Sequence, residues 1–170
     1  LVGAVGSDHL ASLALEGVRK AGVVVSGVRS VAAPTGAAAV GIDARGENQI
    51  MVAAGANLAV EALWLDGLLA HGNTLVLQGE LRRHETEAAI VFAKAKGQPI
   101  ILNLAPVLDL RLDILRAVDI LVVNESEAAA LATRLALSAA DAHTLAGALG
   151  TAVIVTLGEQ GAQTCSAGRA

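Results

Sequence analysis

Short aliphatic runs, several of them followed by stretches of helical spacing, constrain the fold of this chain most. The runs lie at residues 1–5, 74–77, 99–102, 120–123 and 152–156. The helical patterns lie at residues 8–21, 85–96, 125–135 and 139–149. Apolar strands that alternate with helices are typical of a parallel sheet covered by helices on both faces. The sequence therefore predicts an α/β fold.

Composition fits this architecture, because the chain is 54% hydrophobic while aromatic residues make up only 1%. Its core must therefore consist of Ala, Val, Leu and Ile side chains. In the first helix the spacing predicts a buried face of Leu10, Leu13, Ala14, Val18 and Ala21, with Asp8 as N-cap. In the second helix it predicts a buried face of Ala88, Val91, Phe92 and Ala95.

A second pattern interrupts the alternation of strands and helices. Residues 28–32, 36–43 and 48–53 resemble three short strands, with a polar turn at residues 44–47. Three consecutive strands predict a small antiparallel sheet that projects from the main domain as a lid or a dimer contact. The predicted organisation is an α/β core at residues 1–27 and 58–170, incomplete at both ends, and a β-strand lid at residues 28–57.

Several classes of protein are disfavoured by charge and cysteine content. The net charge of −4 provides no basic surface for nucleic acid. Cys165 is the only cysteine, which excludes an internal disulfide and a multi-cysteine metal site and favours a cytoplasmic location. Gly, Asp, Asn and Arg interrupt every apolar stretch before it is long enough to span a bilayer, so no membrane association is predicted.

Polar residues follow the predicted strands where each strand ends. Ligands of an open parallel sheet bind beyond the carboxyl ends of its strands, so these residues are the candidates for a site. Glu80 follows the run at residues 74–77, where a carboxylate can accept hydrogen bonds from substrate hydroxyls. The spacing allows equally that Glu80 is a solvated loop residue.

Asn124 and Glu127 follow the run at residues 120–123, three residues apart in the first turn of a helix. The amide could contact a phosphate group while the carboxylate holds a magnesium-bound water. The same spacing is typical of a capping box, in which the two side chains close the helix N-terminus. From spacing alone, the capping box is the favoured interpretation.

Residues 156–161 carry two glycines directly after the last parallel strand. Gly158 and Gly161 allow a close approach of the backbone to a phosphate, and the Thr156 hydroxyl could bind a phosphate oxygen. A tight turn into a further strand at residues 162–166 explains the same residues and is favoured when they are taken alone.

The order of these segments along the chain is more informative than any one of them. The segments are Gly3-Ala4-Val5-Gly6-Ser7-Asp8, Pro34-Thr35-Gly36, Gly46-Glu47-Asn48, Gly55-Ala56-Asn57, Gln78-Gly79-Glu80, Asn103-Leu104-Ala105-Pro106, Asn124-Glu125-Ser126-Glu127 and Thr156-Leu157-Gly158-Glu159-Gln160-Gly161. Together they resemble ribokinase-like (PfkB family) carbohydrate kinases across the whole chain. Within that family, Gly46-Glu47-Asn48 and Gly55-Ala56-Asn57 resemble the lid region of ribokinases.

The resemblance implies a three-layer ribokinase-like fold and ATP-dependent phosphorylation of a sugar, with D-ribose as the substrate. It implies that Glu80 contacts sugar hydroxyls, that Asn124 lies near the ATP phosphates and that Glu127 helps to position Mg²⁺. The residues implied to line the nucleotide site are Thr156, Leu157, Gly158, Glu159, Gln160 and Gly161. It further implies a homodimer through the lid and leaves a monovalent-cation requirement open. Gly79 replaces the family's usual Leu and Leu104 replaces a Pro, and neither change is expected to abolish binding.

The resemblance also implies motifs that these 170 residues do not contain. The family's catalytic aspartate lies in a Gly-Ala-Gly-Asp motif that opens a helix, and that motif is expected beyond Ala170. No catalytic residue is therefore assigned, both ends are interpreted as cut, and the fragment alone is expected to be inactive. Two alternatives stay open: a non-catalytic nucleotide-binding or dimerising remnant, and a nucleoside or fructose-phosphate kinase of the same family.

Overall fold

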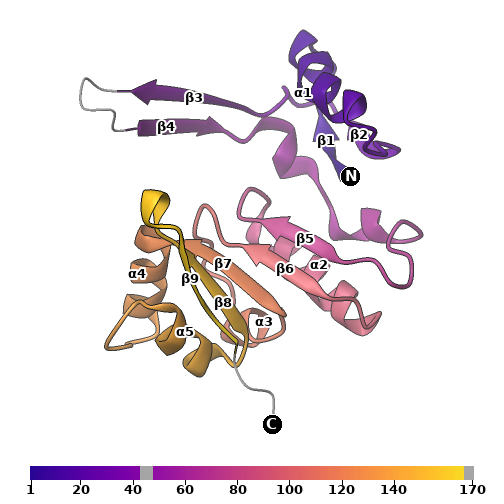
Figure 1. Cartoon of the computed structure of the whole chain (residues 1–170). Helices are drawn as coiled ribbons and strands as arrows, with labels where there is room; N and C mark the ends of the chain where they lie inside the picture. Colours follow the sequence, from indigo (N-terminus) through magenta and orange to yellow (C-terminus); the bar gives the residue numbers. More distant parts are fainter. Residues whose placement is uncertain (43–47, 167–170) are drawn as a thin grey trace. The chain divides into compact units, whose positions relative to one another are not determined.

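The computed structural model describes residues 1–42 and 48–166 and divides the chain into two compact units (Figure 1). Unit 1 is Leu1–Leu68 and unit 2 is Leu69–Ala170. The polar turn predicted at residues 44–47, and with it Gly46-Glu47, lies outside the described residues. Among those described, no helix is long and apolar enough to cross a membrane.

Unit 1 begins with a strand, a helix and a second strand that pairs with the first. β1 (Val2–Val5) leads into α1 (His9–Lys20), and β2 (Gly27–Ser30) then pairs with β1 in parallel. Asp8 is the N-cap of α1, as predicted. The sequence placed β2 in the projecting antiparallel sheet, and that prediction is wrong. A helix between two strands returns the chain to the end at which it began, which favours parallel pairing.

The projecting sheet is a two-stranded hairpin. β3 (Ala37–Ile42) pairs with β4 (Asn48–Ala53) in antiparallel register, from Ala37 opposite Ala53 to Ile42 opposite Asn48. Every residue of β3 is exposed, because the hairpin extends away from the rest of unit 1 (Figure 1). Two short 3-10 helices follow it, Gly55–Ala59 and Ala62–Leu65. The second contains Trp64, which is buried and lies 4.3 Å from the Arg29 guanidinium, measured from ring centroid to Cζ.

Unit 2 contains the sheet that the aliphatic runs predict. Its strands lie in chain order: β5 (Leu75–Gln78), β6 (Ile100–Asn103), β7 (Ile120–Asn124), β8 (Ala152–Thr156) and β9 (Ala162–Cys165). The first four are parallel, and β9 folds back antiparallel to β8. The predicted α/β class is therefore confirmed.

The helices of unit 2 lie on one side of this sheet (Figure 1). They are α2 (Arg83–Ala95), α3 (Leu112–Leu115), α4 (Glu125–Arg134) and α5 (Ala142–Leu149). The covered face carries buried side chains in register across four strands: Leu77, Leu102, Leu121 and Val153.

The opposite face of the unit 2 sheet differs from the prediction that both faces are covered. No described residue of that face is fully buried, and Val76 is 64% exposed. The strand order explains the difference. Each step from β5 to β8 moves in the same direction, and right-handed crossovers in one direction place every helix on the same side.

The buried face of α2 lies two residues earlier in the chain than the predicted one. The structure buries Thr86, Ala89, Ile90 and Ala93. Val91 is 53% exposed, and Phe92 lies under the Lys96 ammonium group, 4.5 Å from Nζ to the ring centroid. Both stripes have helical spacing and are largely apolar, so the periodicity alone does not distinguish them.

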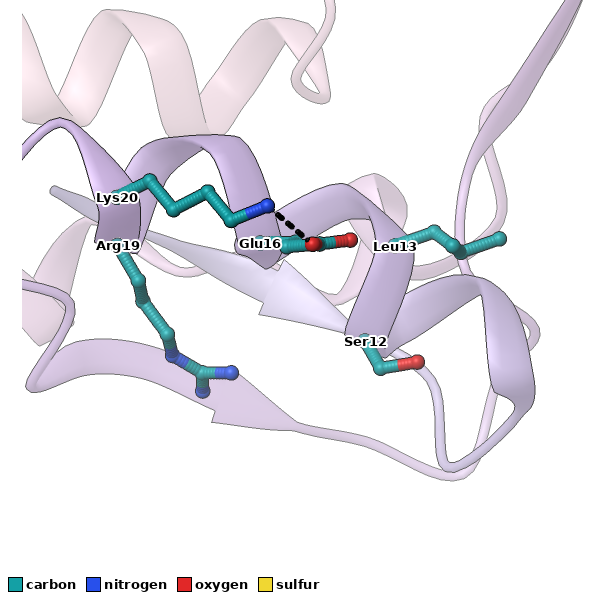
Figure 2. A pocket seen from close by; sticks show the side chains of 5 residues that line it. All are labelled: Ser12, Leu13, Glu16, Arg19 and Lys20. Carbon is teal, nitrogen blue, oxygen red and sulfur yellow. Dashed lines mark hydrogen bonds and ion pairs between the residues drawn. The ribbon is translucent and has the colours of Figure 1, made fainter.

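The buried face of α1 also differs from the prediction, although Val18 lies on both the predicted and the observed stripe. Leu15 is buried, with Ala11 and Val18 half-buried on the same stripe, whereas Leu13 is 60% exposed. Figure 2 shows Leu13 beside a shallow surface pocket of α1, whose other lining residues are Ser12, Glu16, Arg19 and Lys20. Glu16 and Lys20 form an exposed ion pair of 2.5 Å there.

Candidate active site

The four parallel strands of unit 2 end in polar residues at one edge of the sheet. These residues are Gln78, Asn103, Asn124 and Thr156, and all four are exposed. Gln78 lies opposite Asn103 in the strand register, and Asn124 lies opposite Thr156. The structure thus brings together the strand ends that the sequence singled out.

Asn124 and Glu127 form the capping box that their spacing favours. The Glu127 backbone N donates to Asn124 Oδ1 at 2.9 Å, and the Asn124 backbone N donates to Glu127 Oε2 at 2.8 Å. Ser126 Oγ also donates to Asn124 Oδ1, at 2.8 Å. These contacts hold both side chains at the N-terminus of α4.

Capping leaves part of each side chain available for a ligand. Asn124 Nδ2 and Glu127 Oε1 take part in none of the hydrogen bonds found among the described residues. Asn124 is exposed and Glu127 half-buried, at a helix end whose dipole favours anions. The capping box and a phosphate- or magnesium-facing role are therefore compatible.

No three His, Cys, Asp or Glu side chains among the described residues are placed to hold a metal ion between them. Magnesium rarely needs such a cage, because it keeps several waters and binds one or two carboxylates together with substrate phosphates. A single half-buried carboxylate such as Glu127 fits that donor set.

Residues 156–161 form a tight turn, as their glycines favour. A short 3-10 helix, Gly158–Gln160, connects β8 to β9, and the Leu157 backbone N donates to Gly161 O at 2.8 Å. Gly158 and Gly161 have φ angles of 55° and 86°, in the region that favours glycine. The turn does not exclude the nucleotide interpretation, because its residues from Gly158 to Gly161 are exposed and follow Thr156, which lies opposite Asn124 in the strand register.

Glu80 lies just beyond the end of β5, half-buried, and its placement depends on Gly79. The Gly79 backbone N donates to Ala105 O at 2.9 Å, which joins the loop after β5 to the loop after β6. A Cβ atom at Gly79 would lie only 1.9 Å from the Pro106 carbonyl oxygen. The sequence did not indicate this role; the replacement of the expected Leu by Gly was the available signal.

The ends of β5 and β7 are two strands apart, which separates them by about 10 Å at the usual strand spacing. Glu80 stands at one of these ends and the Asn124–Glu127 pair at the other, followed by the turn after β8. This spacing accommodates two adjacent small ligands along one edge of the sheet.

Comparison with known proteins agrees with this geometry. The chain is 33% identical over 178 residues to a ribokinase of Schizosaccharomyces pombe, covering 98% of the chain and 56% of that protein. The ribokinase of Thermotoga maritima superimposes with a TM-score of 0.81 at 28% identity, covering 99% of the chain and 57% of that structure. A ribokinase of Arabidopsis thaliana, solved with ribose and ATP, gives a TM-score of 0.76 at 25% identity, covering 99% and 58%.

The chain spans about half the length of the S. pombe relative and of the two solved structures. The family model described as pfkB family carbohydrate kinase matches residues 1–170. The predicted ribokinase-like fold is confirmed by these structural matches. The chain belongs to the pfkB family of carbohydrate kinases.

Proposed function

We propose that the protein containing this chain transfers the γ-phosphoryl group of ATP to the 5-hydroxyl of D-ribose. The observation that carries the proposal is the single sheet edge at which Glu80, the Asn124–Glu127 pair and the turn after β8 all lie. The S. pombe ribokinase and the A. thaliana ribokinase solved with ribose and ATP support ribose as the sugar.

Each group at the edge has a separate role in this proposal. Glu80 accepts hydrogen bonds from the sugar hydroxyls, and the exposed backbone from Gly158 to Gly161 receives the nucleotide. Asn124 donates from Nδ2 to a phosphate oxygen at the positive end of α4. Mg²⁺, when bound, neutralises phosphate charge. Glu127 Oε1 would hold one of its waters. No described residue is assigned as the base.

The turnover of the natural full-length protein tests the proposal. With ribose, ATP and Mg²⁺ it is expected to release ADP, measured by a coupled assay, whereas the 170 residues alone are expected to give no detectable turnover. Turnover with a nucleoside or a fructose phosphate but not with ribose would show that ribose is not the substrate and would assign that compound in its place. Nucleotide binding without turnover on any sugar would favour the non-catalytic alternative.

We further propose that the hairpin of unit 1 is the lid that the resemblance implies and the contact with a second copy of the chain. Residues opposite one another in an antiparallel pair share a face, so Val40, Ile50, Ala38 and Val52 lie together. Val40, Ile50 and Val52 are 56%, 59% and 53% exposed. An apolar face of this kind supports association through the hairpin.

Dimer formation is checked by sedimentation equilibrium of the full-length protein. The wild type is expected to be a dimer at micromolar concentration, and Val40→Asp is expected to be a monomer. Met51→Asp is the matched control, because Met51 is similarly exposed, at 68%, but lies on the other face of the hairpin. A monomeric wild type, or equal dissociation by both variants, would contradict the proposal.

A further inference from the structure

The hairpin is tied to the start of unit 1 by one buried threonine. Thr35, two residues before β3, is 7% exposed. Its backbone N donates to Asp8 Oδ2 at 2.8 Å, and its Oγ1 donates to Asp8 Oδ1 at 2.7 Å. The same Oγ1 accepts from the Gly6 backbone N at 2.9 Å. Thr35 therefore joins the segment that enters the hairpin to the β1–α1 connection.

The segment that leaves the hairpin is packed against the entering segment, backbone to backbone. The Ala56 backbone N donates to Pro34 O at 2.8 Å. A Cβ atom at Gly55, whose φ is 50°, would lie 2.4 Å from Pro34 O. A Cβ atom at Gly36 would lie 2.8 Å from Ala54 O. The segments that enter and leave the hairpin, residues 34–36 and 54–56, are thus packed together, and the Asp8 carboxylate connects them to the N-terminus of α1.

Asp8 is suited to this task because its carboxylate is ionised at neutral pH. The hydrogen bond from the Thr35 backbone N, followed by that from the Thr35 hydroxyl, holds the pKa of Asp8 below its ordinary value. Asp8 also accepts from the Ala11 backbone N at 3.2 Å as the N-cap of α1. One side chain therefore serves the helix and the hairpin together.

Asp141 has the same cap geometry without the long-range contact. It accepts from the Thr144 backbone N at 2.9 Å and from Thr144 Oγ1 at 2.8 Å, both within the first turn of α5. The threonine bound by Asp8 belongs to the segment that enters the hairpin, whereas the threonine bound by Asp141 belongs to the helix that Asp141 itself caps. Asp141 provides a control for the loss of a cap alone.

We propose that Asp8 is a positioning residue that fixes, through Thr35, the direction in which the β3–β4 hairpin leaves unit 1 and so the affinity of the full-length protein for ribose. The sugar part rests on the proposed function. The hairpin part rests only on the hydrogen bonds and close contacts of unit 1.

The test uses Asp8→Asn and Thr35→Val in the full-length protein. Asn at position 8 keeps one acceptor oxygen but turns an NH₂ group toward a donor of Thr35, and Val removes the hydroxyl. In both variants hydrogen exchange of the β3 and β4 amides is expected to be about tenfold faster, because a buried hydrogen-bonded link is lost. The KM for ribose is expected to rise about tenfold, with kcat and the KM for ATP within about twofold of wild type.

Two further variants separate positioning from folding. Thr35→Ser keeps the hydroxyl and is expected to restore wild-type exchange and KM, and Asp141→Asn is expected to leave both unchanged. If Asp8→Asn does not fold, the comparison of hairpin exchange and KM for ribose between Thr35→Val and Thr35→Ser tests the proposal by itself.

Unchanged hairpin exchange in the Thr35→Val variant would overturn the proposal, and so would equal loosening of the hairpin by Asp141→Asn. Faster exchange with an unchanged KM for ribose would overturn its sugar part. If the wild type does not phosphorylate ribose, the proposed function fails, and the exchange measurements still decide whether Asp8 positions the hairpin.

Discussion

Leucine at position 79 is expected to lower the free energy of unfolding by about 3 kcal/mol. The resemblance to ribokinase-like kinases implies Leu at this position, yet here a Cβ atom alone would meet the Pro106 carbonyl oxygen at 1.9 Å. The obstacle is backbone, which cannot rotate away as a side chain does. The loop after β6 must therefore move, and the hydrogen bond from Gly79 N to Ala105 O is lost with it. Urea unfolding followed by circular dichroism measures the loss.

The same substitution is expected to weaken ribose binding by the full-length protein, because Glu80 directly follows the displaced residue. A control is available in the same unit. A Cβ atom at Gly147, in the middle of α5, would meet nothing within 4 Å, so Gly147→Ala is expected to stabilise the protein by about 0.5–1 kcal/mol. A Gly79→Leu variant as stable as wild type would show that the two loops are not in contact as described.

Glutamine at position 127 is expected to raise the Mg²⁺ concentration needed for half-maximal turnover by about 10- to 100-fold. Gln keeps an oxygen that can accept from the Asn124 backbone N, so the capping box is retained. The charge that would hold a magnesium-bound water is lost. The measurement is the initial rate of the full-length protein as a function of Mg²⁺ at saturating ATP and ribose.

Glu127→Ala distinguishes the two roles of this side chain, because it removes the cap and the charge together. It is expected to show the same change in Mg²⁺ dependence and in addition a loss of about 1 kcal/mol in stability. If Gln behaves like wild type in Mg²⁺ dependence while Ala is impaired, Glu127 acts only as a helix cap.

The parallel sheet and its polar edge were predictable because both depend on local sequence. Strands of a parallel sheet form continuous apolar runs, as residues 120–123 do, and the polar residue that follows marks the strand end. The capping box at Asn124 was predictable for a similar reason, because both partners belong to one helical turn.

Features set by distant partners were not predictable in this way. β2 has the composition of a hairpin strand, and only the path of α1 makes it a neighbour of β1. Val91 and Ile90 are equally apolar, and only the packing of α2 on the sheet decides which is buried. The role of Gly79 depends on a loop 26 residues further along the chain, at Ala105, so no local pattern reveals it.

Trp64 is the only tryptophan of a chain that has no tyrosine, and it is buried in unit 1. Tryptophan fluorescence therefore reports the unfolding of residues 1–68 alone. The far-ultraviolet circular dichroism of the backbone reports the unfolding of both units. Coincident denaturation curves would mean that the two units melt as one cooperative system, and separated curves that each melts independently. The chain carries its own optical label for one of its two units.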